Sequence, residues 1–226
     1  MKILQVLLGE VPYLLGGLLV TLELLVGLLT IGLGFGLLLA GFEVYGGRFL
    51  SRIAAIFQRA LRGIPALVLL FLSFYAMPVP PLIAAIVGLG LRSAAYQSQI
   101  FRGAIQATKT GQMEAARSLG MTKFASIVYV VLPQALRRAI GPWSNEYASE
   151  AKDTSLAYVI GVVEILRRAG YIISYTYGNA LLIYGLVAVV YFIITRAGNA
   201  FLYWLEDKFW VPGFERRGSS DSSHST

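Results

Sequence analysis

Charged residues within long apolar stretches are the groups in this sequence that could do chemistry. Three acids stand at i, i+4 and i+7, a spacing that places side chains on one face of a helix: Glu146, Glu150 and Asp153. An earlier stretch repeats this spacing with a base, an aromatic ring and an amide: Arg92, Tyr96 and Gln99. A further acid, Glu23, lies alone in the first apolar stretch. Opposite charges at such positions predict either a polar pathway or internal ion pairs.

The depth of these residues limits what they can contact. With a rise of 1.5 Å per residue, Glu23, Arg92 and Glu146 lie roughly 16 to 18 Å into the stretches that carry them. An unpaired charge in the middle of a bilayer costs about 2.5 kcal/mol or more. These side chains are therefore expected to face one another, a cavity or a second subunit.

Two interpretations of these charges stay open from the sequence. In the first, Arg92 meets the carboxylate of a zwitterion, and Glu146 or Glu150 meets its ammonium group or a cationic side chain. The same pathway would include Glu23, Tyr96, Asp153 and Thr154. In the second, Arg92 pairs with a glutamate and the pair fixes helix register without touching a substrate. Glu146 is then the first candidate partner and Glu150 the second.

The composition argues against most other kinds of chemistry. The chain has no cysteine, and its single histidine, His224, lies in a Ser-rich tail, so disulfides, zinc sites and histidine-based catalysis are not expected. No Gly-x-x-x-x-Gly-Lys-Ser/Thr pattern occurs, so any ATP and Mg²⁺ that drive transport must bind a separate subunit. We therefore expect this chain to be no enzyme and to hold no cofactor or metal. The net charge of +7 indicates no nucleic acid, because the basic residues follow a membrane pattern.

The apolar content predicts a polytopic protein of the lipid bilayer. Of the 226 residues, 57% are apolar and 14% are charged, against about 25% charged in soluble domains. A transmembrane helix needs about 20 apolar residues, and a break at 77–81 divides one long run. We expect an all-α domain over residues 1–217, followed by a polar, disordered tail at 218–226. Its five expected spans are 11–42, 55–77, 80–103, 134–151 and 180–205.

The basic residues set the expected orientation. The loop after the first span carries four of them, and the segment 102–138 carries six. Cytoplasmic loops contain an excess of Lys and Arg, so both segments are expected inside the cell. The N-terminus then lies outside and the C-terminus in the cytoplasm. Arg167 and Arg168 fall outside and are outnumbered.

A polar insert at 106–133 separates the third and fourth expected spans and should lie outside the bilayer. Its central part has the composition of a helix. One face of this helix would carry Glu114, Arg117, Ser118 and Met121, by their i, i+3, i+4 and i+7 spacing. The next stripe would carry Ala116, Gly120 and Phe124, where two small residues let another backbone approach closely.

Five ordered motifs resemble those of ABC importer permeases. Glu114-Ala115-Ala116, with Gly120 and Leu132-Pro133, resembles the EAA loop of that family. The other motifs resemble its polar amino-acid uptake group, of the histidine, glutamine and arginine type: Leu61-Arg62-Gly63-Ile64-Pro65, Ala95-Tyr96 with Ile100-Phe101-Arg102-Gly103, Pro133 to Arg138, and Lys152 to Leu156. The resemblance extends from about Thr21 to Phe209. The chain departs from the pattern at Gln99, where Glu is usual, at Thr108-Lys109, and at Ser149-Glu150-Ala151, where an apolar run is usual.

The resemblance implies a permease of the type I ABC importer fold in a prokaryotic cell membrane. The implied partners are a second permease subunit, the same or homologous, a dimer of cytoplasmic ABC ATPase subunits and an extracytoplasmic substrate-binding protein. The residues implied to couple to the ATPase are Glu114, Ala115, Ala116, Arg117, Gly120 and Lys123. Two alternatives explain less. A channel or secondary transporter leaves the EAA insert unexplained, and a docking scaffold leaves the intramembrane charges unexplained.

Overall fold

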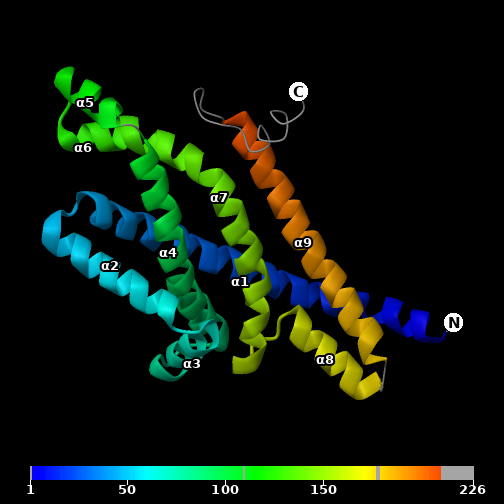
Figure 1. Ribbon diagram of the computed structural model, residues 1–226. Helices are drawn as coiled ribbons and strands as arrows, with labels where there is room; N and C mark the ends of the chain where they lie inside the picture. The colour runs from blue at the N-terminus through cyan, green and yellow to red at the C-terminus, as the bar shows by residue number, and fades with distance from the viewer. Residues whose placement is uncertain (1, 109, 177–178, 210–226) are drawn as a thin grey trace, which may run out of the picture.

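The computed structural model describes residues 2–108, 110–176 and 179–209 (Figure 1). Regular secondary structure in these residues is entirely helical, which confirms the expected all-α class. In chain order the elements are α1 (Lys2–Tyr45), α2 (Gly47–Gly63), α3 (Ala66–Ala76), α4 (Pro81–Ala107), α5 (Thr110–Ser118), α6 (Lys123–Ser126), a π-helix (Ile127–Val131), α7 (Leu132–Asp153), a 3₁₀-helix (Thr154–Ile160), α8 (Ile165–Thr176) and α9 (Ala180–Lys208).

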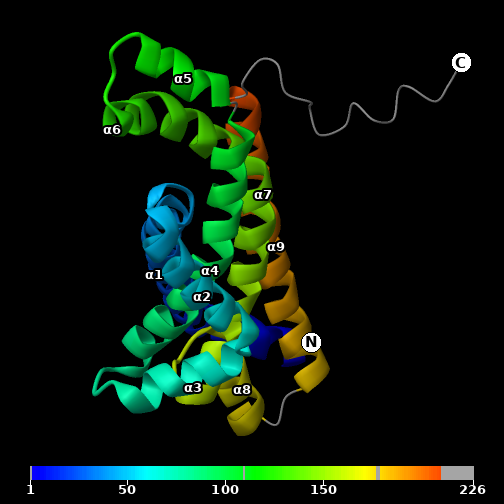
Figure 2. The ribbon, with the colours of Figure 1, turned by 60° about the vertical axis from the view of Figure 1, so that its left-hand side comes forward.

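Three segments have the length and composition to cross a membrane. α1 from Gly9 onward and α9 qualify by themselves, and the bent pair of α2 and α3 qualifies as one broken span. Figures 1 and 2 show α4, α7 and α9 running alongside one another, with α1 crossing them obliquely. The total of five spans stays a prediction, and the expected tail at 218–226 lies outside the described residues.

Glycines on α1 let α4 approach closely. A Cβ atom on Gly32 would collide with the side chain of Gln97, and one on Gly36 would lie 3.0 Å from the carbonyl oxygen of Ala94. Ala40, next on the same stripe, is fully buried. α1 and α4 are therefore closely packed along this stripe. Small residues serve this purpose because lipid offers no hydrophobic drive between helices, so close van der Waals contact has to hold them together.

The second expected span, 55–77, is interrupted by a sharp bend in the structure. α2 ends at Gly63, α3 begins at Ala66, and their axes differ by 104°. Pro65 explains the break, because a proline drives the residue before it out of the α-helical region. Ile64 accordingly has φ −90° and ψ 131°. The bend separates the arginine-rich α2 from the apolar α3.

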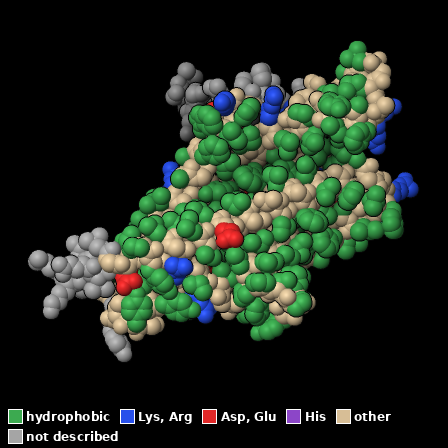
Figure 3. All heavy atoms as spheres, turned by 180° about the vertical axis from the view of Figure 1, so that it is seen from behind, with side chains coloured by type: hydrophobic (Ala, Val, Ile, Leu, Met, Phe, Trp, Pro, Cys, Tyr) green, Lys and Arg blue, Asp and Glu red, His purple; other side chains and the backbone are tan. Residues whose placement is uncertain are grey.

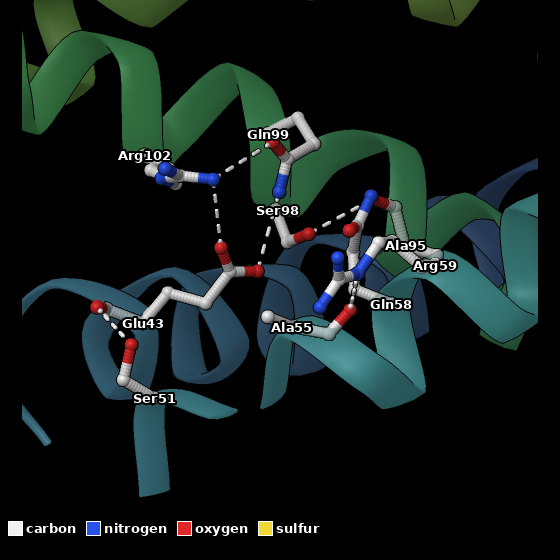
Figure 4. A network of polar contacts seen from close by, with 9 residues as sticks. All are labelled: Glu43, Ser51, Ala55, Gln58, Arg59, Ala95, Ser98, Gln99 and Arg102. Carbon is white, nitrogen blue, oxygen red and sulfur yellow. Dashed lines mark hydrogen bonds and ion pairs between the residues drawn. The ribbon is translucent and has the colours of Figure 1, made fainter. Parts of the chain in front are cut away.

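A buried acid ties α1 and α2 to α4 (Figure 4). Glu43 of α1, whose side chain is 3% exposed, accepts hydrogen bonds from Arg102 Nη1 at 3.0 Å and Gln99 Nε2 at 3.2 Å. The Ser51 hydroxyl of α2 donates to the Glu43 carbonyl oxygen at 2.9 Å. A little further along α2, Gln58 donates to the carbonyl oxygen of Ala95. Hydrogen bonds from Gln99, Arg102, Ser51 and Gln58 therefore join the three helices at this junction.

The polar insert folds as a helical arm at the ends of α4 and α7 (Figure 2). α5 ends in two backbone hydrogen bonds, from Met121 N to Ala116 O and from Gly120 N to Arg117 O. This is the Schellman pattern, which requires a left-handed residue after the helix, and Gly120 has φ +84°. The expected stripe of Ala116, Gly120 and Phe124 is therefore wrong as one helical face, because the helix ends before Gly120.

Large apolar side chains dominate the outer surface of the helical body (Figure 3). Leu19 and Val26 of α1 are 68% and 64% exposed, and Phe192 of α9 is 65% exposed. Isolated charges interrupt this face in the space-filling view. A continuous apolar exterior of this kind suits contact with lipid, since a soluble protein rarely exposes large contiguous apolar patches.

Candidate functional site

Arg92 of α4 meets two acids of α7, and this charge cluster is the candidate site. Arg92 Nη1 donates to Asp153 Oδ2 at 2.8 Å and lies 3.6 Å from Glu150 Oε1. The prediction that Arg92 faces the acidic face of the later helix is thus met in the structure. The expected first partner, Glu146, is wrong, because the hydrogen bond goes to Asp153.

The helix α7 brings the acids together because it continues past the expected end of the fourth span. The span was expected to stop at residue 151, but α7 runs without a break to Asp153. Glu150 and Asp153 therefore stay one turn apart on one helix face. The chain then tightens into a 3₁₀-helix, which ends at Gly161 with φ +97°.

Two arginines stack on one tyrosine at the edge of the cluster. The guanidinium of Arg92 lies 4.7 Å from the centre of the Tyr96 ring, and that of Arg62 lies 5.0 Å from it. Both distances fall within the range of a cation–π interaction. Arg62 comes from the end of α2, and sequence reasoning missed it as a site residue. The available signal was the Leu61-to-Pro65 motif, in which Arg62 directly precedes the bend.

Glu150 is the least satisfied group of the cluster. Its side chain is fully buried, and neither carboxylate oxygen accepts a hydrogen bond from an N–H or hydroxyl group of the described residues. The hydrogen-bonding neighbour of Glu150 is the carboxyl group of Glu146. Arg92 and Asp153 are more accessible, with side chains 17% and 25% exposed. Glu146 is partly buried one turn before Glu150, within electrostatic range of Arg92, Asp153 and Arg62. The cluster therefore holds a partly exposed ion pair, Arg92–Asp153, beside a buried pair of glutamates, Glu146 and Glu150.

Two residues expected in the pathway have other roles. Glu23 is exposed on the outer side of α1, and none of the described residues forms a hydrogen bond or ion pair with it, so the structure does not bring it to the cluster. Thr154 is fully buried, and its hydroxyl donates to the carbonyl oxygen of Ala151 at 2.8 Å. This hydrogen bond stabilises the end of α7. The Thr154 hydroxyl is therefore not available to a ligand.

Another buried acid, Glu164, has hydrogen-bond donors to both of its carboxylate oxygens. Its carboxylate accepts the backbone N–H groups of Leu166 at 2.8 Å and Arg167 at 2.7 Å, at the start of α8. The hydroxyl of Tyr191 donates to it at 3.0 Å. Glu164 therefore caps α8 and anchors α9, a structural role that the sequence did not reveal.

The expected coupling residues lie on the arm formed by α5 and α6. Glu114, Ala115 and Arg117 are exposed on α5, whereas Ala116 is 4% exposed and packs inward. Lys123 is also exposed, and its ammonium lies 5.9 Å from the ring of Tyr45 at the end of α1. Two large apolar side chains lie beside these residues on the arm. Leu119 is 85% exposed and Phe124 is 75% exposed, so both make little contact with the rest of the protein.

Comparison with known proteins shows the class of this chain. Residues 32–210 match the model of a family described as binding-protein-dependent transport system inner membrane component. The glutamine transport system permease protein GlnP of Escherichia coli (strain K12) is 37% identical over 208 residues, covering 89% of this chain and 94% of that protein. The L-cystine transport system permease protein TcyB of Bacillus subtilis (strain 168) is 36% identical over 188 residues, covering 81% and 80%.

Solved structures agree with these relatives. An amino acid ABC transporter crystallised with histidines has a chain with TM-score 0.81 and 32% identity, covering 92% of this chain and 99% of that one. The MetNI methionine ABC transporter in an inward-facing conformation has a chain with TM-score 0.65 and 23% identity, covering 85% and 94%, and at that identity it supports the fold alone.

The helical fold and the apolar exterior thus define a polytopic helical membrane protein. The chain belongs to the family of binding-protein-dependent transport system inner membrane components, the permeases of ABC importers. The resemblance inferred from the five motifs is therefore confirmed.

Proposed function

We propose that this chain is the transmembrane permease subunit of an ATP-driven importer of polar amino acids. The relatives named above support this substrate class, since glutamine and L-cystine appear in their names. The chain's own contribution is the cluster around Arg92, which offers a guanidinium to a carboxylate and acids to a cationic group. A zwitterion needs both kinds of partner wherever water is excluded, because a buried charge without a partner is costly.

The helical arm carries the coupling part of the proposal. Leu119 and Phe124 are large apolar side chains that are almost fully exposed on an arm that stands at one end of the helical body (Figure 2). Exposed apolar groups on a polar segment indicate a protein contact. We assign this contact to a groove on a cytoplasmic ATPase subunit, which would bind ATP and Mg²⁺ on behalf of the complex. The exposed arm is the single observation that carries the proposal.

The remaining partners follow from the same assignment. Two permease subunits, two ATPases and an extracytoplasmic binding protein would form the importer, and closure of the ATPase pair would move the arms together and reopen the pathway. The arm then lies in the cytoplasm, with the N-terminus outside. Single cysteines can test this orientation, since the chain has none of its own. A cysteine at Arg48 should be labelled only from the cytoplasmic side and one at Val79 only from outside.

Substitution of Gly120 tests the coupling assignment. Gly120→Trp should leave the permease folded in the membrane but abolish both ATPase pull-down and transport, because the ring would block the docking surface. Gly120→Asn should retain both, since asparagine tolerates a positive φ better than other side chains. Gly185→Trp is the matched control, because Gly185 faces open space on α9, away from the arm. Wild-type pull-down and transport in Gly120→Trp would refute the assignment.

A further inference from the structure

α2 carries a row of arginines that neither the candidate site nor the coupling arm uses. Arg48, Arg52 and Arg59 stand at i, i+4 and i+11, so they form one stripe along the helix, the arginine stripe. All three side chains are exposed, and α2 contains no acid. Among the described residues, none forms an ion pair or a hydrogen bond with the side chain of Arg48 or Arg52, and Arg59 donates to the carbonyl oxygen of Ala55 on its own helix.

A second exposed stripe on the same helix is apolar. Its members share the spacing i, i+4, i+7 and i+8: Phe49, Ile53, Ile56 and Phe57. Phe49 is 76% exposed and Ile56 is 62% exposed. Another face of α2 packs on the protein, since the buried side chain of Gln58 donates to the carbonyl oxygen of Ala95 in α4. α2 is therefore held by one face and leaves a cationic stripe and an apolar stripe uncovered.

This combination is typical of a helix that lies in the boundary layer of a membrane. Such helices bury an apolar face among acyl chains and present Lys and Arg to anionic lipids. With 17 residues, α2 is about 25 Å long, which is short of the roughly 30 Å of a hydrocarbon core. It follows directly on α1, which is long and apolar enough to span a membrane by itself.

The position of α2 agrees with this interpretation. The turn between α1 and α2 points toward the arm formed by α5 and α6 (Figure 2). In the orientation proposed above, the arginine stripe thus begins on the cytoplasmic side. Anionic lipids give the cytoplasmic leaflet a negative surface potential, which attracts basic segments next to a membrane span.

We propose that the arginine stripe and the apolar stripe of α2 together form a binding site for an anionic phospholipid. Arg48 and Arg52, one turn apart, hold the lipid phosphate, which a guanidinium can bind through two parallel hydrogen bonds. An acyl chain lies along the neighbouring apolar stripe. A zwitterionic lipid also has a phosphate, but its ammonium group cancels the charge that the arginines attract. The site goes beyond the proposed function, because it requires only that the chain lies in a bilayer.

A second copy of this chain suits the same surface less well. In a twofold contact the same patch on both subunits meets itself. The arginine stripe would then face a second arginine stripe, and α2 has no acid to compensate. The chain as a whole carries a net charge of +7, so like charges would repel over a wider area as well. Lipid phosphates supply the anions that α2 lacks.

Competition between two short-chain lipids tests the proposal. The full-length permease is purified alone in a neutral detergent and incubated with dioctanoyl phosphatidylglycerol, which is anionic, or dioctanoyl phosphatidylcholine, which is zwitterionic. Native mass spectrometry measures the bound fraction at each lipid concentration. The wild-type protein should bind the anionic lipid at least about fivefold more tightly, since each arginine at a membrane surface contributes about this factor. Combining Arg48→Gln with Arg52→Gln should remove most of this preference.

Two further double variants separate the site from a general effect of charge. Arg137→Gln with Arg196→Gln removes the same charge from exposed arginines of α7 and α9, and should keep the wild-type preference. Arg48→Lys with Arg52→Lys preserves the charge of the stripe and should keep most of the preference. Glycerol 1-phosphate, a headgroup without acyl chains, should bind far more weakly than the anionic lipid, because it leaves the apolar stripe uncovered.

Three results would overturn the proposal. Equal binding of the two lipids by the wild-type protein is the most direct, and that comparison needs no variant to fold. An equal loss of preference in the control at Arg137 and Arg196 would show an effect of net charge alone. Binding of glycerol 1-phosphate as tightly as the lipid would mean a site for a free anion. If the wild-type protein shows no preference and the change at Arg48 and Arg52 converts dimers into monomers in the same spectra, the surface is instead an interface between subunits. These measurements involve neither an ATPase nor an amino acid, so their failure leaves the proposed function unaffected.

Discussion

Arg92 and Arg102 both project from α4 toward acids on other helices, yet their surroundings differ. Arg102 shares one buried acid, Glu43, with Gln99, and the charges balance one to one. Arg92 faces several acids, and one of them accepts no hydrogen bond from an N–H or hydroxyl group of the described residues. The comparison teaches that a buried ion pair is not by itself evidence of a functional site. A fully bonded pair suits helix packing, whereas a guanidinium placed between two carboxylates, as Arg92 is, can change partner.

The sharpest test of this difference is the loss of Arg92. Arg92→Met leaves Asp153 and Glu150 without their shared cation and should lower stability by about 3–5 kcal/mol, as expected for breaking a buried pair. Thermal unfolding in detergent measures this loss. Removing all three charges, with Asp153→Asn and Glu150→Gln added, should restore the fold but not transport. Wild-type transport by the triple variant would mean that the cluster serves only to fix helix register.

Removal of Arg102 should have a smaller effect of a different kind. In Arg102→Met, Glu43 keeps its bond from Gln99 but loses its counter-charge, so stability should fall by roughly 1–2 kcal/mol. Adding Glu43→Gln should recover most of this loss, since no buried charge then remains. Both variants should transport with unaltered selectivity in proteoliposomes. Impaired transport by a folded variant of this pair would contradict the contrast between the two clusters.

The smallest effect is expected at Glu23. Glu23→Gln should change the stability of the detergent-solubilised subunit, where this exposed side chain is not held in lipid, by no more than about 0.5 kcal/mol, and should leave transport unchanged. Its exposed position on α1, without a partner among the described residues, is the reason. Thermal unfolding and uptake assays on the same preparation measure both quantities. Loss of transport would instead support the interpretation that Glu23 lies on the substrate pathway, as a third functional charged region besides the two on α4.

Much of the candidate site could be predicted because it depends on spacing within one helix. The i, i+4 and i+7 positions of Glu146, Glu150 and Asp153 fix their common face wherever α7 lies. The same holds for Arg92 and Tyr96 on α4. The motif order around the EAA loop was equally readable, and the family comparison confirms it.

The pairing itself was beyond the sequence. Depth estimates favoured Glu146 as the partner of Arg92, but Arg92 is hydrogen-bonded to Asp153, the last residue of α7, and lies within ion-pair distance of Glu150, the second expected partner. The hydrogen bonds from Gln99 and Arg102 to Glu43 were also not predicted, because Glu43 lies far from both residues along the chain.

The sequence by itself determined that this protein is helical, embedded in a membrane and built around a polar coupling insert, because hydrophobic periodicity and charge distribution act locally along the chain. Only the tertiary structure decided which charges meet and that Gly120 serves a left-handed turn. The physical reason is that a helix fixes the relative direction of its own side chains, whereas its rotation and height against a neighbour depend on packing contacts from distant parts of the chain.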